Sequence, residues 1–190
     1  MNSYPRMRVV LSLCAAVFAA APATADPLCD ALWFTRNLVF DRAGYCFSSP
    51  LGQANFSAEC STSSPEISGA DKLVVDLARQ EEEMWECNVD TSRTTLEAWD
   101  TQVLAFIEDL PVPTGYESAC LGWRGEMLML RAARDPAADT TGFIRAGNDI
   151  LLSFHEVAGW TFVSMTRDGQ GLGWLQMPPW TEGACDGYAG

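Results

Sequence analysis

Residues 159–163 have the sequence GWTFV, and residues 171–175 have the sequence GLGWL. Each stretch is a short apolar run that begins at a glycine and contains a tryptophan. Several runs of this kind occur in the second half of the chain, with turn residues between them, and this pattern indicates a small antiparallel barrel or sandwich. The predicted strands are Met127–Leu130, Ile150–Phe154, Trp160–Met165 and Gly173–Met177.

The first half of the chain has helical periodicity instead. Asp26 and Pro27 suit a helix start, the aspartate as cap and the proline at the first helical position, and Gly44 suits its end. A second helix is predicted from Ser68, a capping residue, to about Glu86. We expect its inward face to consist of Leu73, Val74, Leu77, Met84 and Trp85.

A third helix is predicted before residue 111, because apolar residues there recur in steps of three and four. Threonines and a valine in the same stretch also suit a strand, so helix and strand both stay open for residues 95–110. The sequence PVPTG that follows interrupts the pattern, and we place a linker at residues 111–119. The expected modules are residues 26–110, which are helical, and residues 120–185, which form strands. The periodic residues of the third helix are Leu96, Trp99, Val103, Phe106 and Leu110.

The N-terminus has the pattern of a secretory signal peptide. Arg6 and Arg8 precede an apolar run at residues 9–21, and small residues follow it, so cleavage is expected between Ala25 and Asp26. The apolar run is shorter than the roughly 20 residues of a membrane-spanning helix, and no later run approaches that length. We therefore expect an exported protein, periplasmic or secreted, with residues 1–25 removed and no transmembrane segment.

Six of the seven cysteines lie outside the signal peptide, which favours three disulfides in an oxidising compartment. The nearest two, Cys46 and Cys60, are 14 residues apart, too far for the close pairs of a typical zinc site, so no metal or other cofactor is expected. Cys29 and Cys46 cannot pair with each other, because the first predicted helix separates them by about 20 Å. We expect Cys120–Cys185, with either Cys29–Cys87 and Cys46–Cys60, which we favour, or Cys29–Cys60 and Cys46–Cys87.

Two resemblances follow from these residues. Residues 120–177 resemble a bacterial SH3-like domain: a Leu-Met-Leu-Arg strand at 128–131 is followed by a proline turn, a Gly-Asn-Asp turn at 147–149, and the two tryptophan stretches. That resemblance implies a five-stranded barrel in an exported protein, a module that often recognises cell-wall or peptide ligands.

Residues 28–90 resemble a YARHG domain, a small extracellular module of unknown activity. The motif corresponds to Phe40-Asp41-Arg42-Ala43-Gly44, in which the arginine and glycine match the pattern. Phe40, Asp41 and Ala43 replace its tyrosine, alanine and histidine, so proton chemistry by a motif histidine has no carrier here.

The chain is strongly acidic, with 25 Asp and Glu against 12 Lys and Arg and a net charge of −13. Both basic residues of the predicted signal peptide precede the first acid, so its removal changes the balance to −15. Residues 26–110 carry −11 of this and residues 111–190 carry −4. Nucleic acid is excluded as a partner, because its binding depends on Lys and Arg at the phosphates.

Most polar candidates for a site have a structural interpretation. We expect Arg36 and Arg42 to pair internally with neighbouring acids and with carbonyls of the Gly44 turn. The acids Glu81, Glu82 and Glu83 fit a solvated helix face, and His155 fits a strand position at the surface. Catalysis is not expected, since a chain with a single histidine lacks the parts of a nucleophile triad.

A contact surface on the predicted barrel would consist of Trp123, Arg131, Trp160 and Trp174. Core packing also accounts for tryptophan at positions 160 and 174, so we expect those two to be mostly buried and Trp123 to be more exposed.

The sequence thus predicts an α+β protein in which a small disulfide-linked helical module precedes a five-stranded SH3-like β-barrel. The expected function is non-catalytic recognition of an envelope protein or cell-wall material by a monomer. Two alternatives stay open: an acidic inhibitor of a basic periplasmic protein, and an accessory carboxylate hydrolase of the cell wall that uses acids such as Glu126 or Glu156.

Overall fold

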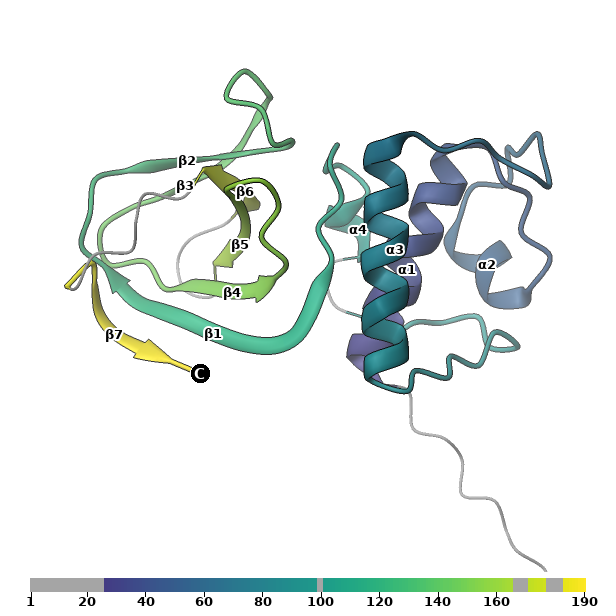
Figure 1. Cartoon of the computed structure of the whole chain (residues 1–190), viewed down its shortest axis with the longest axis horizontal. Helices are drawn as coiled ribbons and strands as arrows, with labels where there is room; N and C mark the ends of the chain where they lie inside the picture. Colours follow the sequence, from purple (N-terminus) through teal and green to yellow (C-terminus); the bar gives the residue numbers. More distant parts are fainter. Residues whose placement is uncertain (1–25, 99–100, 166–170, 177–182) are drawn as a thin grey trace, which may run out of the picture.

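The computed structural model describes residues 26–98, 101–165, 171–176 and 183–190. A layer of helices from the first half of the chain lies beside a curved antiparallel sheet from the second half (Figure 1). The predicted α+β class is therefore confirmed. The predicted signal peptide, including Ala25 on one side of the cleavage position, lies outside the described residues.

The helical layer consists of α1 (Pro27–Arg42), α2 (Pro50–Asn55) and α3 (Gly69–Met84). Side-chain caps set all three starts, as predicted for the two long helices. Asp26 Oδ1 accepts the N–H of Leu28 at 2.9 Å, and Ser68 Oγ accepts the N–H of Asp71 at 3.1 Å. These bonds satisfy donors that a helix N-terminus leaves open.

The predicted inward face of α3 is confirmed at Val74, and Leu77 is partly buried against the same core, but the prediction is wrong at Leu73, Met84 and Trp85. Leu73 and Met84 are exposed, whereas Val75 and Ala78 are buried against α1. Ala78 is completely buried, so a small side chain lies in the core at this position of α3. Leu73 and Met84 therefore lie on other sides of the helix.

Among the described residues of 95–110, only α4 (Thr101–Leu104) is helical and none belongs to a strand, so both the long third helix and its strand alternative are wrong; Trp99 lies outside the described residues. The backbone groups that a longer helix would use have other partners. Glu108 N–H and Asp109 N–H donate to Ala132 O at 3.0 and 3.3 Å, and four carbonyls between residues 104 and 108 accept from Arg42. The apolar residues Leu104, Ile107 and Leu110 are nevertheless buried.

The second half of the chain forms one seven-stranded antiparallel sheet with the order β3-β2-β6-β5-β4-β1-β7. The described strands do not close into the predicted five-stranded barrel, because β3 and β7 are the two edges. Four strands lie within one residue of the predicted positions, and β1 covers most of the residues predicted as a linker, 111–119. The strands are β1 (Pro113–Trp123), β2 (Leu128–Arg131), β3 (Thr140–Ile144), β4 (Ile150–Phe154), β5 (Trp160–Met165), β6 (Leu172–Gln176) and β7 (Cys185–Ala189).

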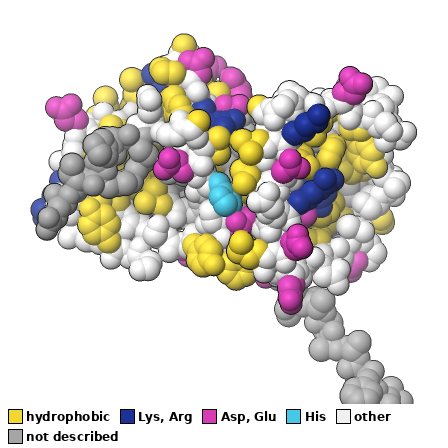
Figure 2. Space-filling model, in the orientation of Figure 1, with side chains coloured by type: hydrophobic (Ala, Val, Ile, Leu, Met, Phe, Trp, Pro, Cys, Tyr) yellow, Lys and Arg dark blue, Asp and Glu magenta, His cyan; other side chains and the backbone are white. Residues whose placement is uncertain are grey.

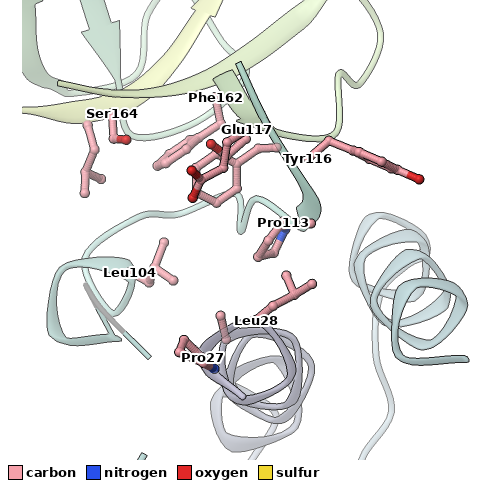
Figure 3. A pocket seen from close by; sticks show the side chains of 13 residues that line it. Pro27, Leu28, Leu104, Pro113, Tyr116, Glu117, Phe162 and Ser164 are labelled. Atoms are coloured by element: carbon pink, nitrogen blue, oxygen red, sulfur yellow. The ribbon is translucent and has the colours of Figure 1, made fainter. Parts of the chain in front are cut away.

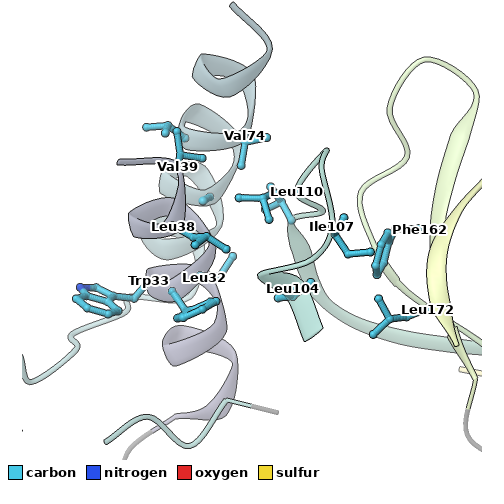
Figure 4. Close-up of a cluster of buried hydrophobic side chains, with 14 of the residues drawn as sticks. Leu32, Trp33, Leu38, Val39, Val74, Leu104, Ile107, Leu110, Phe162 and Leu172 are labelled. Carbon is cyan, nitrogen blue, oxygen red and sulfur yellow. The ribbon is translucent and has the colours of Figure 1, made fainter. Parts of the chain in front are cut away.

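Alternate residues of the central strands face two different cores. The sheet core, to which all seven strands contribute, contains Val163 of β5 and Leu175 of β6. The junction core lies between the sheet and the helices and contains Phe162 and Trp174, the neighbours of those two residues in sequence. In Figure 4 the junction core extends from the helices through α4 and the segment that follows it to β5 and β6. The two halves of the chain are therefore packed into one another.

Three disulfides link the chain: Cys29–Cys87, Cys46–Cys60 and Cys120–Cys185. The favoured pairing of the six cysteines is confirmed. Cys29–Cys87 joins the start of α1 to the residues after α3, and Cys120–Cys185 joins β1 to β7.

Candidate functional site

The three predicted contact tryptophans are all buried, so they do not form a surface. Trp160 and Trp174 belong to the junction core, as expected, but Trp123 lies in the sheet core with 6% of its surface exposed, and its expected exposure is wrong. Each of two indole N–H groups has a backbone acceptor: Trp123 Nε1 donates to Glu126 O at 2.9 Å, and Trp174 Nε1 donates to Asp109 O at 2.6 Å. The structure therefore separates Trp123 from the other two.

Arg131, the fourth predicted contact residue, stabilises the connection between β2 and β3. Its Nη1 donates to Ala138 O and to Thr140 Oγ1, both at 3.0 Å. The side chain is half-buried and its planar guanidinium is already engaged on one side. Arg131 thus has a structural role in this hairpin.

An apolar pocket of about 350 Å³ lies between the helical layer and the sheet, in the range of small-molecule sites. Sequence reasoning missed this pocket, because its walls come from segments that are adjacent only after the helices pack on the sheet. In Figure 3 the helical residues lie on one side of it and the sheet residues on the other. The helical side is entirely apolar and consists of Pro27, Leu28, Ala31 and Leu104.

The polar groups of the pocket come from the sheet side, where Glu117, Ser153 and Ser164 stand on β1, β4 and β5. Ser164 is 4% exposed, and its hydroxyl has no hydrogen-bond partner among the described residues. A buried hydroxyl without a partner costs about 1–3 kcal/mol of stability. No lysine or arginine lines the described part of the pocket, so Glu117 supplies its only formal charge.

One end of the pocket is shaped by Gly115, which has a φ of +71°. A Cβ atom at this position would come within 2.6 Å of the Trp85 ring and 2.7 Å of Leu28. Only glycine therefore lets β1 pass this close to the helices. The next residue, Tyr116, makes an edge contact with Trp85, with ring centroids 5.6 Å apart.

A carboxylate–histidine pair joins the helices to the sheet beside this end of the pocket. His155 Nε2 lies 2.7 Å from Glu81 Oε1, and Trp85 Nε1 donates to Glu81 Oε2 at 3.1 Å. Glu81 is buried, so the prediction of a solvated face for this residue is wrong. His155 is only partly exposed, and the single histidine is visible where the two halves meet (Figure 2).

The arginines of α1 pair internally, as predicted, although with other partners than expected. Arg36 Nε forms an ion pair with Glu82 at 3.0 Å. The motif residue Arg42 donates from Nη1 to Glu108 O at 2.9 Å and from Nη2 to Ile107 O at 2.6 Å. Partial burial lowers the pKa of the Arg42 guanidinium, and the nearby carboxylate of Asp71 opposes this shift. The guanidinium thus links the end of α1 to the segment after α4 by hydrogen bonds.

Within the described part of the chain, no three His, Cys, Asp or Glu side chains are grouped so that they could hold a metal ion. The helices of this part include none that is both long and apolar enough to cross a membrane.

Comparison with known protein families matches both halves of the chain. A YARHG domain matches residues 7–83, which confirms the resemblance of the N-terminal half, and a domain of unknown function, DUF4453, matches residues 86–190. The two matches meet at the end of α3. No curated protein and no solved structure matches the chain. Because the second match covers more than half of its length, the chain belongs to the DUF4453 family and carries a YARHG domain before the DUF4453 region.

Proposed function

We propose that this protein is an exported, non-catalytic recognition protein of the cell envelope that binds its partner in the pocket between the helices and the sheet. The observation that carries the proposal is the pocket itself, which combines apolar walls with a few polar groups on one side. This composition is typical of binding sites. The site differs from the barrel surface expected from the sequence, because both halves of the chain contribute to it.

The surroundings of the pocket support binding rather than catalysis. Glu126 and Glu156, the acids considered for a hydrolase, are both exposed, and neither lines the pocket. A glycosidase needs two carboxyl groups about 5–10 Å apart across a cleft. Glu117 is the one carboxylate among the described lining residues.

Export is part of the proposal, with residues 1–25 as its signal peptide and the periplasm or the exterior as its destination. The three disulfides and the extracellular YARHG type fit an exported protein. Intact mass of the protein isolated from its native cell tests this part. We expect a chain that begins at Asp26 with all six remaining cysteines oxidised; retained residues 1–25 or free thiols would contradict it.

We also propose that β2 to β6 and the end of β1 represent an SH3-like sheet, extended by the first part of β1 and by β7. The support is the order of turns and tryptophans in the sequence, together with a sheet that curves around its own core. An experimental structure tests this assignment. A strand order incompatible with the SH3-like topology would overturn it.

Blocking the pocket tests the recognition function. Ser153→Phe puts a ring into the pocket at a half-buried strand position, where aromatic residues are well tolerated. Leu121→Phe puts the same ring at an exposed position of β1 that does not line the pocket, and is the matched control. We expect envelope material captured by the wild-type chain to be lost with Ser153→Phe and retained with Leu121→Phe. Equal capture by all three proteins would refute the proposed site.

A further inference from the structure

We infer that the pocket takes a hydrophobic amine: a ligand with an apolar body that lies against the helices and a protonated amino group that faces the sheet. The inference rests on the proposed function and specifies its ligand class. Three observations carry it: the two-sided lining of the pocket, the hydroxyl of Ser164, which has no partner among the described residues, and the distribution of charge around the pocket.

The lining of the pocket orients an amphiphilic ligand. Leu28, Ala31 and Leu104 offer only apolar surface from the helical side, whereas Glu117 and Ser164 lie on the opposite side (Figure 3). At about 30 Å³ for each water-sized group, a volume of about 350 Å³ holds roughly a dozen such groups. The apolar body is therefore compact, comparable to an alkyl chain of about eight carbons or to one fused ring system.

The hydroxyl of Ser164 selects a ligand that can form hydrogen bonds. It is buried in the wall of the pocket and bonds to no described residue. A hydroxyl both donates and accepts, so an amine or an alcohol would satisfy it and a pure hydrocarbon would not. The ligand therefore carries a polar group on the side that faces β5.

The charges around the pocket favour a cation over an anion. Glu117 is the only charged residue of the described lining, and Asp26 stands next to the lining residue Pro27. The N-terminus of α1, which would otherwise attract an anion, is already capped by the Asp26 carboxylate, which accepts from Leu28 N–H at 2.9 Å. A carboxylate or phosphate ligand would thus meet like charge and no basic partner, whereas an ammonium group would meet Glu117.

Three probes of equal chain length separate these contributions: n-octylammonium, n-octanol and n-octanoate. Binding to the full disulfide-bonded chain is followed by calorimetry and by the methyl NMR signals of Leu28, Ala31 and Leu104. We expect octylammonium to bind at least five-fold more tightly than octanol, and octanoate to bind at least ten-fold more weakly than octylammonium. If octanoate or octanol bound as tightly as octylammonium, the inference would be overturned.

Two substitutions assign the selectivity to residues. Glu117→Gln removes the charge at an exposed position, and we expect it to reduce octylammonium binding to the level of octanol while octanol is unchanged. Ser164→Ala is expected to weaken both probes two- to ten-fold. Glu126→Gln, an exposed acid outside the pocket, is the control and leaves all three affinities as they are. If Glu117→Gln still bound octylammonium more tightly than octanol, the charge of Glu117 would not be the source of the selectivity.

Ser153→Phe distinguishes a wrong ligand class from a wrong recognition site. Ser153→Phe should abolish octylammonium binding as well as the capture of envelope material. If capture depends on residue 153 but octylammonium does not bind, recognition at the pocket stands and the ligand class is wrong. If octylammonium binds and capture is indifferent to Ser153→Phe, the pocket is a binding site but not the recognition site.

Discussion

The sheet core and the junction core share β5 and β6 but are held together differently. The sheet core lies within one half of the chain, and the buried disulfide Cys120–Cys185 belongs to it. The junction core joins two segments that belong to different domain families, and polar contacts such as Glu81–His155 cross between the same two halves. Neither half of the chain completes the junction core alone. We therefore expect the described parts of the chain to unfold as one unit.

Two neighbouring residues of β5 belong to different cores, and we expect the largest loss of stability from substitution of the first. Phe162, completely buried in the junction core, stands next to Val163, completely buried in the sheet core. We expect Phe162→Ala to cost about 3–5 kcal/mol of stability, because a large cavity opens between helices and sheet. Val163→Ala removes two methyl groups and should cost about 2 kcal/mol.

Urea unfolding, followed by circular dichroism for the helices and by near-ultraviolet signals for the tryptophans, measures both effects. We expect coincident transitions in the wild-type chain and in both variants. Phe162→Leu, which keeps most of the apolar volume, is the matched control and should recover most of the loss. A Phe162→Ala protein whose helices unfold at the wild-type urea concentration would show that the halves are independent.

Removing disulfides tests how much the sheet core depends on covalent closure. Cys120–Cys185 spans 65 residues and Cys46–Cys60 spans 14. Loop entropy in the unfolded chain predicts contributions of about 4 and about 3 kcal/mol. We therefore expect the double variant Cys120→Ala/Cys185→Ala to be less stable than Cys46→Ala/Cys60→Ala by about 1 kcal/mol in chemical denaturation. If Cys46→Ala/Cys60→Ala were the less stable variant, residual structure in the unfolded chain or strain in the folded chain would contribute more to the free energy than loop length does.

A smaller effect is expected at the motif arginine, which stabilises the segment that lies between the two halves. Arg42→Lys keeps the charge but loses the planar guanidinium that reaches several carbonyls at once. We expect a loss of about 1–3 kcal/mol, since hydrogen bonds to a charged group are lost. Hydrogen exchange at the amides of Ile107 and Glu108 should accelerate, whereas Arg79→Lys, on the exposed side of α3, should leave it unchanged. Slow exchange in Arg42→Lys would contradict this role.

The sequence predicts well what local chemistry determines. Asp26 and Ser68 cap the helices that their positions predict, and the glycine-bounded strands β4 and β5 have the predicted bounds. The length of the first helix excludes a Cys29–Cys46 bridge, and of the two pairings that this leaves open the structure has Cys29–Cys87 with Cys46–Cys60. These features depend on short stretches of chain and on simple distances.

What the sequence did not predict depends on the junction between the halves. The spacing of Leu104, Ile107 and Leu110 resembles a helix, yet these residues are buried in an irregular segment whose carbonyls bind Arg42. Glu81 looked like part of a charged helix face, because its partners, His155 and Trp85, are brought together only by packing. The pocket was missed for the same reason, since no local pattern marks a wall assembled from two halves.

The smallest expected effect lies in an exposed turn outside both cores. The side-chain and backbone hydrogen bonds from Ser92 to the Asp90 carboxylate, at 2.7 and 2.9 Å, lower the pKa of Asp90. Because this pKa is lower in the folded state, its contribution to stability is full above the unfolded-state value of about 3.9 and is lost as the pH falls through the folded-state value.

Ser92→Ala removes the hydroxyl and keeps the backbone donor. We expect the pKa of Asp90, followed by the NMR signal of its carboxyl carbon, to rise towards its usual value but not to reach it. The backbone amide signals of β7, in the other half of the chain, are the internal reference and should not change. Since the turn belongs to neither core, the urea transition at neutral pH should stay close to that of the wild-type chain. A large loss of stability in Ser92→Ala would contradict this expectation and would mean that the turn is essential for the packing of α1 and α2, which it contacts.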